Sequence, residues 1–215
     1  MPTYLQLTNR NSRPLPPEFQ GDDVRFPESL VEHFLNEFTK QGDIVLDPFA
    51  GYGTTLLAAE GGGRAGYGVE FDERRVRHVR GLLQHPERLV HGDARRLAEY
   101  DFPPVDLCFT SPPYTTRGDP DDPFTNYAQK GAGYAAYLEE MGRIFTQVAG
   151  LLKPSARAVI EIANLKDGSG VTPLAWDVAA AGSKVLHFEG EIVVCWDRYG
   201  YGYDHSYCLV FSSHR

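Results

Sequence analysis

The chain has 215 residues, 42% of them hydrophobic, which is enough apolar material for the core of one ordinary domain. Its formal net charge of −8 opposes non-specific binding to nucleic acid, which depends on neutralising phosphates, so a nucleic-acid enzyme of this charge needs a local basic patch, a partner or both. No stretch has the length and apolarity of a membrane span or signal peptide, and the three cysteines lack zinc-site spacing, so we expect a cytoplasmic protein with reduced thiols and no bound metal.

The first 25 residues contain several prolines and little periodicity, and they predict an irregular N-terminal arm. We expect residues 26–215 to form a single domain. Its first predicted element is a helix over residues 27–39, where apolar residues recur at helical spacing. Pro27 suits a first helical turn, and Gly42 follows the predicted end.

A glycine-rich turn joins the first predicted strand to the second helix. The apolar run 44–46 ends in Asp47, and residues 48–55 (Pro-Phe-Ala-Gly-Tyr-Gly-Thr-Thr) lead into an apolar helix. Glycines permit a tight turn and close approach of a ligand, and amide groups at a helix start can hold a polar group. The spacing differs from the dinucleotide-binding GxGxxG pattern, so the turn alone does not define its ligand.

Acidic residues follow three successive predicted strands. Asp47 closes the strand over residues 44–47, Glu70 follows the strand 65–69, and Asp93 follows the strand at 89–91. One explanation of these three acids is that acidic residues commonly begin the helix that follows a strand. However, ligands of open α/β sheets bind at the carboxyl ends of strands, and an acid after the second strand can accept hydrogen bonds from a ribose diol. We therefore expect one ligand to lie across these strand ends.

The fourth predicted strand, residues 105–109, runs into Thr-Ser-Pro-Pro-Tyr at residues 110–114. Two consecutive prolines cannot donate hydrogen bonds to a sheet, so the strand stops there and its carbonyls are held rigidly. A serine oxygen, rigid carbonyls and a tyrosine ring suit a planar group that bears an amine, because the oxygens accept its N–H groups and the ring stacks on its face. A plain proline-rich turn is the alternative, and the acidic strand ends upstream favour a site.

The rest of the chain predicts a substrate loop and the closing elements. Residues 115–133 are rich in Gly, Asp and Pro and are too long and polar for a simple connection, so we expect a mobile substrate loop. The remaining elements are predicted as helices over 134–152 and 171–181, a buried strand over 156–163, and an antiparallel hairpin of strands over 184–196 and 207–212.

Residues 47–55 and 110–114 together resemble the two signature motifs of the amino-methylating DNA methyltransferases, which use S-adenosylmethionine. Residues 25–27 and 204–211 are similar to further segments of that family, so the likeness spans nearly the whole chain. Serine before Pro-Pro-Tyr resembles the cytosine-N4 branch more than the adenine-N6 branch. The resemblance implies an α/β, Rossmann-like class I methyltransferase fold: a mostly parallel seven-stranded sheet with helices on both faces and a C-terminal antiparallel hairpin.

The resemblance also implies which residues form the site. The cofactor-binding set would be Phe26, Pro27, Asp47, Pro48, Phe49, Ala50, Gly51, Gly53, Thr54, Thr55, Glu70, Phe71, Asp93 and Ala94. Within it, Glu70 would bind the ribose and Asp93 would lie by the adenine. The catalytic set would be Ser111, Pro112, Pro113 and Tyr114, which would hold a flipped cytosine. Position 52, often a small residue in the family, is Tyr52 here.

The predicted function is methyl transfer from S-adenosylmethionine to the exocyclic N4 amine of cytosine in DNA. Two alternatives stay open: the same chemistry on a base amine of RNA, where single strands need no flipping, and a non-catalytic cofactor-binding subunit of a methyltransferase complex. The chain leaves little room for a separate target-recognition domain, so we expect a homodimer or a recognition partner to supply that part, and no membrane partner.

Overall fold

The computed structural model describes residues 2–22, 24–168, 170–198 and 202–213. Its main sheet contains β1 (Tyr4–Leu7), β2 (Ile44–Asp47), β3 (Ala65–Glu70), β4 (Leu89–His91), β5 (Val105–Thr110), β6 (Leu152–Ile162), β9 (His187–Trp196) and β10 (His205–Ser212), and a separate ribbon contains β7 (Leu165–Asp167) and β8 (Gly170–Thr172). The α-helices are α1 (Glu28–Phe38), α2 (Thr54–Gly61), α3 (Glu73–Arg80), α4 (Tyr134–Leu151) and α5 (Leu174–Gly182). Short 3₁₀ helices are η1 (Pro17–Asp22), η2 (Pro86–Arg88), η3 (Ala94–Glu99) and η4 (Pro123–Thr125).

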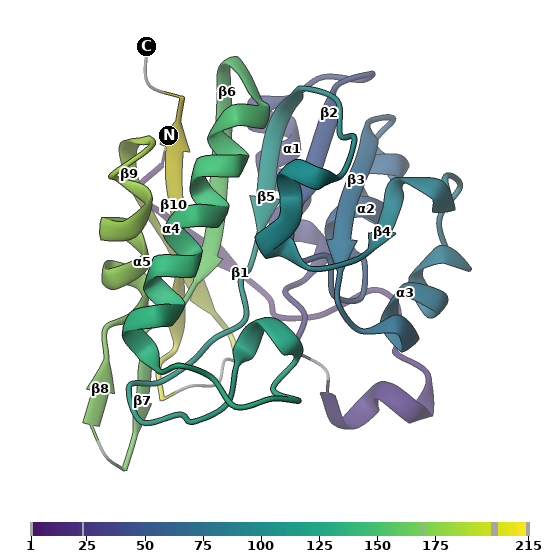
Figure 1. The fold of residues 1–215 in the computed structure, drawn as a ribbon. Coiled ribbons are helices and arrows are strands. Elements are labelled where there is room, and N and C mark those ends of the chain that lie inside the picture. The colour runs from purple at the N-terminus through teal and green to yellow at the C-terminus, as the bar shows by residue number, and fades with distance from the viewer. Residues whose placement is uncertain (1, 23, 169, 199–201, 214–215) are drawn as a thin grey trace.

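The sheet has the order β1-β9-β10-β6-β5-β2-β3-β4. Strands β6, β5, β2, β3 and β4 run parallel to one another, and β10 runs antiparallel to both β6 and β9. The expected α/β fold with a closing antiparallel hairpin is therefore confirmed. Because the parallel strands end at one edge, the ends of β2, β3 and β5 meet at the lower edge of the sheet as drawn in Figure 1.

Helices cover both faces of the sheet, as Figure 1 shows, with α4 and α5 in front and α1 and α2 behind. The central strand β5 is buried on both sides: Leu107 and Phe109 pack in the core under α1, and Cys108 packs in the core under α4. A strand buried on both faces has a nearly continuous apolar sequence, which is why residues 105–109, apolar except for Asp106, were recognisable as a strand.

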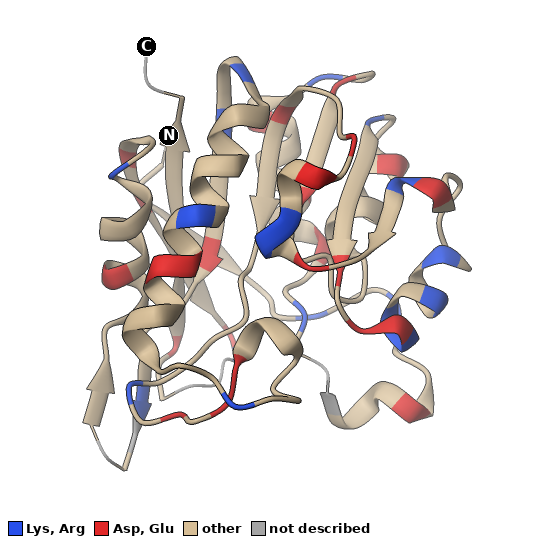
Figure 2. Cartoon of the chain, in the orientation of Figure 1, with Lys and Arg blue, Asp and Glu red and all other residues tan. Residues whose placement is uncertain are grey.

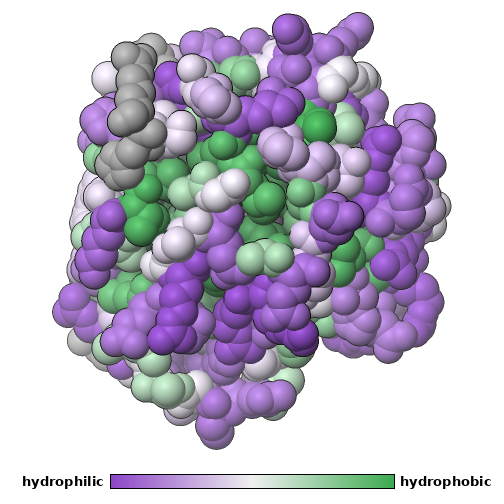
Figure 3. Space-filling view, turned by 45° about the horizontal axis from the view of Figure 1, so that its top comes forward, coloured by the Kyte–Doolittle hydropathy of each residue, from purple (hydrophilic) through white to green (hydrophobic). Residues whose placement is uncertain are grey.

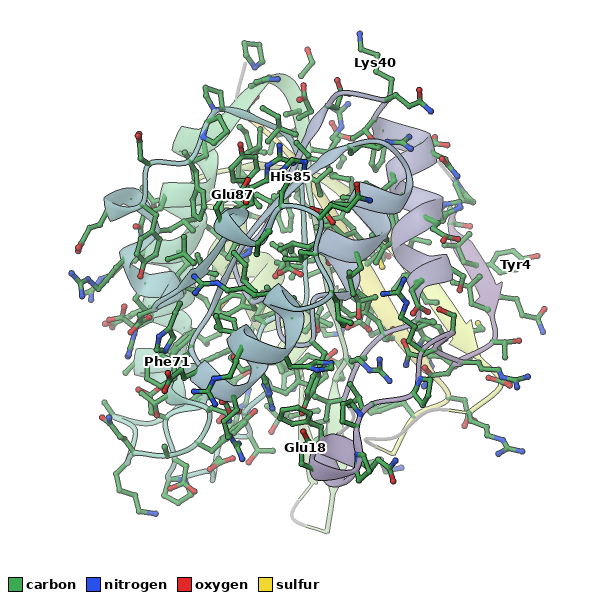
Figure 4. All side chains as sticks on the ribbon, turned by 90° about the vertical axis from the view of Figure 1, so that its right-hand side faces the viewer. Tyr4, Glu18, Lys40, Phe71, His85 and Glu87 are labelled. Carbon is green, nitrogen blue, oxygen red and sulfur yellow. The ribbon has the colours of Figure 1, made fainter. Side chains whose placement is uncertain are left out.

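The structure differs from the prediction in the N-terminal arm. The main sheet has eight strands instead of seven, because β1 pairs in parallel with β9 at the sheet edge, Tyr4 opposite Val193. Leu5 and Leu7 pack against the α1 side of the core, whereas Tyr4 is 65% exposed and points away from the edge (Figure 4). Two alternating leucines give too short a pattern to predict a strand, and pairing with β9 supplies the remaining stabilisation.

A second difference lies before α5. Val171 and Thr172, expected to be helical, pair in β8, and α5 begins only after Pro173. A proline disfavours helical geometry in the residue before it, which keeps the helix from starting earlier. The turn of the C-terminal hairpin includes residues 199–201, which lie outside the described residues. No helix in the described part of the chain is long and apolar enough to span a membrane. In Figure 3 the molecule is turned so that the edge of the sheet opposite the carboxyl ends of the parallel strands comes forward. This side shows hydrophobic patches among hydrophilic residues.

Candidate active site

A cavity of about 960 Å³ lies at the carboxyl ends of β2, β3 and β5. Both sequence motifs line it, together with the N-terminal segment around Arg25 and loop residues such as Asn126 and Tyr127. Ligand pockets commonly enclose about 300–1,000 Å³, so this cavity has room for a nucleoside-sized molecule and part of a second ligand. Of the three acids at the strand ends that we expected to face one ligand, only Glu70 lines this cavity.

The structure brings most of the predicted site residues to this cavity. Those that line it are Phe26, Pro48, Phe49, Ala50, Gly51, Thr54, Glu70, Phe71, Ala94, Ser111, Pro112, Pro113 and Tyr114. Those that do not are Pro27, Asp47, Gly53, Thr55 and Asp93. The contacts of three residues of the second group, Asp47, Gly53 and Asp93, are described below.

The glycine-rich turn has a backbone that only glycine adopts easily. Gly51 and Gly53 have φ angles of 53° and 78°, in the left-handed region. A Cβ on Gly53 would lie 2.4 Å from Val79 Cγ1, so this glycine also permits the close packing of α2 on α3. Tyr52 between them is buried, with its ring 5.3 Å from that of Phe19. Tyr52, which stands where the family often has a small residue, thus packs η1 against the turn.

Glu70 presents a buried carboxylate to the cavity. It is 7% exposed; one oxygen accepts a hydrogen bond from the Gly51 amide at 2.8 Å, and the other accepts one from the Asp72 amide at 2.8 Å. Burial raises its pKa, partly opposed by these bonds. A carboxylate oxygen has more than one acceptor position, so each can still receive a ligand hydroxyl. The adjacent residue Phe71, labelled in Figure 4, is 37% exposed and offers an apolar surface beside the carboxylate.

Asp47 lies beneath the cavity instead of lining it. Its carboxylate is 1% exposed and accepts hydrogen bonds from the Phe49 amide at 3.0 Å and from the Thr110 hydroxyl. Burial raises its pKa to about 6. The carboxylate is therefore engaged by donors of the protein itself. Asp47 joins the end of β2 to the end of β5.

Asp93 also differs from its expected placement, because its carboxylate holds an arginine. Arg95 reaches Asp93 at 2.6 Å and Asp122 at 3.1 Å, and its guanidinium lies 5.4 Å from the ring centre of Phe124. Asp122 and Phe124 belong to the predicted substrate loop. Asp93 therefore anchors that loop through Arg95, while its neighbours Gly92 and Ala94 line the cavity.

The substrate loop packs onto the site through aromatic rings. Phe124 is stacked between Phe49, with ring centres 6.1 Å apart, and Tyr137, at 5.2 Å. The Tyr137 hydroxyl donates to the Pro113 carbonyl at 3.1 Å, and the Tyr127 hydroxyl donates to the Tyr114 carbonyl at 2.5 Å. These bonds fix the proline-containing segment from the loop side.

Glu161, which the sequence analysis did not select, is a central residue of the site. It lies on β6, is 4% exposed and lines the cavity. One of its oxygens accepts hydrogen bonds from the Ser111 hydroxyl at 2.9 Å and the Tyr114 hydroxyl at 3.0 Å. The only signal in the sequence was a single acid within the run 156–163, which is otherwise apolar except for Arg157.

The charges around the site are mostly paired. Figure 2 shows basic residues along α3 and acidic residues near the strand ends. On α3, Arg74 reaches Asp72 at 2.9 Å, Arg77 reaches Glu73 at 3.1 Å, and Arg80 donates to the Leu89 carbonyl at 2.7 Å. Within the described ranges, no group of three or more His, Cys, Asp or Glu side chains could hold a metal ion.

Comparisons with known proteins show which proteins the chain resembles. The structure resembles that of TrmN from Thermus thermophilus, with a TM-score of 0.65 and 20% identity over 95% of this chain and 55% of that one. The chain has the fold of the class I S-adenosylmethionine-dependent methyltransferases, as the sequence predicted. Residues 8–80 match the model of the N6/N4 DNA methylase family. This match confirms the resemblance to the amino-methylating DNA methyltransferases over that part of the chain.

Two curated relatives agree with this class. The chain is 40% identical to the type II methyltransferase M.BglII of Bacillus subtilis over 53 residues, which are 25% of this chain and 15% of that protein. It is 35% identical to the DNA adenine methyltransferase YhdJ of Escherichia coli K12 over 82 residues, which are 38% of this chain and 27% of that protein. The matched stretches thus span well under a third of either relative. S-adenosylmethionine is the cofactor of this class, and the buried Glu70 carboxylate beside an exposed ring fits its ribose and adenine.

Proposed function

We propose that the protein transfers a methyl group from S-adenosylmethionine to the exocyclic N4 amine of cytosine in DNA. The observation that carries the proposal is that Ser111, Pro112 and Tyr114 line the same cavity as the glycine-rich turn and Glu70. A cofactor held across the turn and an amine held at Pro112 would lie within one enclosure. Bringing two reactants together in this way can lower a barrier by several kcal/mol, up to about 7–11 kcal/mol.

The residues on the cofactor side of the cavity would bind and orient S-adenosylmethionine. Glu70 would accept the ribose hydroxyls, Phe71 would cover the adenine, and the turn at Gly51 would admit the methionine end closely. When bound, the cofactor supplies an electrophilic methyl group. Asp47 and Gly53 would act from beneath by holding the turn in shape.

The residues on the amine side would hold a planar base. The carbonyls of Pro113 and Tyr114 already accept protein hydrogen bonds, whereas no hydrogen bond within the described ranges ends on the Pro112 carbonyl. That carbonyl and the Ser111 oxygen would accept the two amine N–H groups, which favours a nitrogen whose lone pair is available for transfer. The Tyr114 ring would stack on the base, and a paired base would have to flip out of the duplex to reach it.

A labelled-methyl assay tests the proposal. Duplex DNA, single-stranded DNA and total RNA are each incubated with the protein and labelled S-adenosylmethionine, and the modified nucleosides are identified. We expect N4-methylcytosine in DNA. N6-methyladenine in DNA would retain the class and overturn the choice of base, label in RNA alone would favour the RNA alternative, and no label with intact cofactor binding would favour the non-catalytic subunit.

Site variants make the assay specific to the predicted residues. Ser111→Ala and Tyr114→Ala should each remove most transfer while binding of S-adenosylhomocysteine persists, because both lie on the amine side of the cavity. Thr146→Ala, an exposed position on α4 whose hydroxyl bonds only within its own helix, is a matched control. Full turnover by a Ser111→Ala/Tyr114→Ala double variant would contradict the assignment.

A further inference from the structure

We propose that Glu161 is a positioning residue that makes the Ser111 hydroxyl an acceptor for the target amine and takes up, through that hydroxyl, the proton that the amine loses. The inference rests on the proposed methyl transfer and adds a residue to it. No part of the family resemblance pointed to Glu161, which lies on β6, outside both sequence motifs.

The register of the sheet brings the two groups together. Strands β5 and β6 are parallel neighbours, with Thr110 opposite Ile160, so the next residues along each strand, Ser111 and Glu161, meet at the same level at the edge of the cavity. The Ser111 hydroxyl reaches a Glu161 oxygen at 2.9 Å. The contact is therefore fixed by backbone pairing and does not depend on a flexible loop.

This hydrogen bond decides the direction of the next one. A serine hydroxyl has one proton and two lone pairs. When its proton is donated to Glu161, the Ser111 oxygen can only accept from another group, and it is made more electron-rich by the charge behind it. An exocyclic amine, which presents N–H groups, is then favoured at Ser111, and a ring nitrogen or carbonyl oxygen that needs a donor is disfavoured. Glu161 thus contributes to the choice of an amine as substrate.

The same pair can remove the proton after transfer. The amine nitrogen forms its bond to the methyl carbon as the S–C bond breaks, and the electron pair of that bond stays on sulfur. The nitrogen, now positively charged, gives a proton to the Ser111 oxygen while the Ser111 proton passes to Glu161. The carboxylate ends neutral and the methylated amine ends neutral, so charge and atoms balance. Because Glu161 lines the cavity, it can return the proton to solvent when the products leave.

Tyr114 ties the stacking ring to the same carboxylate. Its hydroxyl donates to the same Glu161 oxygen at 3.0 Å, so one buried group orients both the acceptor and the ring. Burying a carboxylate is costly unless hydrogen bonds compensate, and two of its donors come from the amine-side motif. A purely structural role would not require that both partners face the cavity.

The test compares Glu161→Gln with wild type. Glutamine keeps the shape and can still contact Ser111, but it cannot take up a proton. We expect kcat to fall about 100-fold or more, as for loss of a general base, while the KM for cofactor and the dissociation constants of S-adenosylhomocysteine and of DNA change less than about threefold. Glu161→Asp, which keeps the carboxylate, should recover part of kcat. Glu191→Gln, the same change at an exposed position on β9 outside this cavity, is the control and should behave as wild type.

The outcomes separate the two proposals. If wild type labels no nucleic acid, the proposed function fails. If wild type is active and Glu161→Gln matches its kcat, the role of Glu161 is refuted. If Glu161→Gln does not fold or bind S-adenosylhomocysteine, Glu161→Asp decides: a kcat above that of Ser111→Ala supports the role, and a kcat no higher, with intact binding of S-adenosylhomocysteine, refutes it.

Discussion

Asp47 provides a quantitative test of how the site is built. Burial raises its pKa from an ordinary 3.8 to about 6. Between these two values, the folded state holds a proton that the unfolded chain has already lost. Below about pH 4, Asp47 is protonated in both the folded and the unfolded state, so its burial costs little. As pH rises from about 4 through about 6, the folded state must bury the charged carboxylate or keep the proton, and the free energy of unfolding falls. At about 1.4 kcal/mol per pKa unit, the loss approaches 3 kcal/mol at neutral pH.

Replacing Asp47 with Asn removes that pH dependence. The Asn oxygen can still accept from the Phe49 amide and the Thr110 hydroxyl, so the difference in unfolding free energy between variant and wild type should move by up to about 3 kcal/mol in favour of the variant from about pH 4 to 8. Urea denaturation of both proteins at a series of pH values measures this difference. Asp101→Asn, at an exposed position, is the control and should show no such trend. A difference that is flat with pH, or that favours wild type as pH rises, would refute the reasoning.

Three further predictions follow from individual contacts. Gly53→Ala should destabilise the fold by about 2 kcal/mol or more, because a left-handed φ and the Val79 side chain both oppose a Cβ, whereas Gly61→Ala, with open space around it, should be neutral or stabilising in the same urea assay. Arg95→Ala should release the 115–133 loop and speed its cleavage by protease, unlike Arg96→Ala, whose ion pair with Glu99 is exposed. Glu70→Gln should weaken S-adenosylhomocysteine binding about tenfold or more in calorimetry, since charged acceptors contribute about 1.5–3 kcal/mol; unchanged affinity would exclude Glu70 from ribose binding.

The central strand and the glycine-rich turn could be predicted from the sequence because their patterns are local. The strand over residues 105–109 is apolar except for Asp106, and the two prolines after it set its end within one residue of the observed Thr110. The glycine-rich turn was visible because Gly51 and Gly53 occupy left-handed conformations that other residues avoid. Such signals depend on residues that are neighbours in the chain, so they can be recognised without a structure.

What could not be predicted depends on contacts between distant segments. Glu161 is 50 residues from its partner Ser111, and only the register of β5 and β6 joins them. Asp93 follows a strand end, as a ligand-binding acid would, and only the position of Arg95 and Asp122 shows that it anchors the loop. The strand β1 exists because β9 offers it an edge 189 residues away, Tyr4 to Val193. In each case the residue type was compatible with several roles, and packing selected one.

The end of β5 is held from both sides, which explains how one short segment can serve two functions. The Thr110 hydroxyl donates toward Asp47 at the end of β2, and the Ser111 hydroxyl donates toward Glu161 at the end of β6. Successive residues of a strand point to opposite sides, so consecutive hydroxyls can reach separate acids. A change at Asp47 should therefore disturb both the cofactor turn, through Phe49, and the amine side, through Thr110, whereas a change at Glu161 should disturb the amine side alone. This asymmetry is the reason that cofactor binding is expected to survive the loss of Glu161.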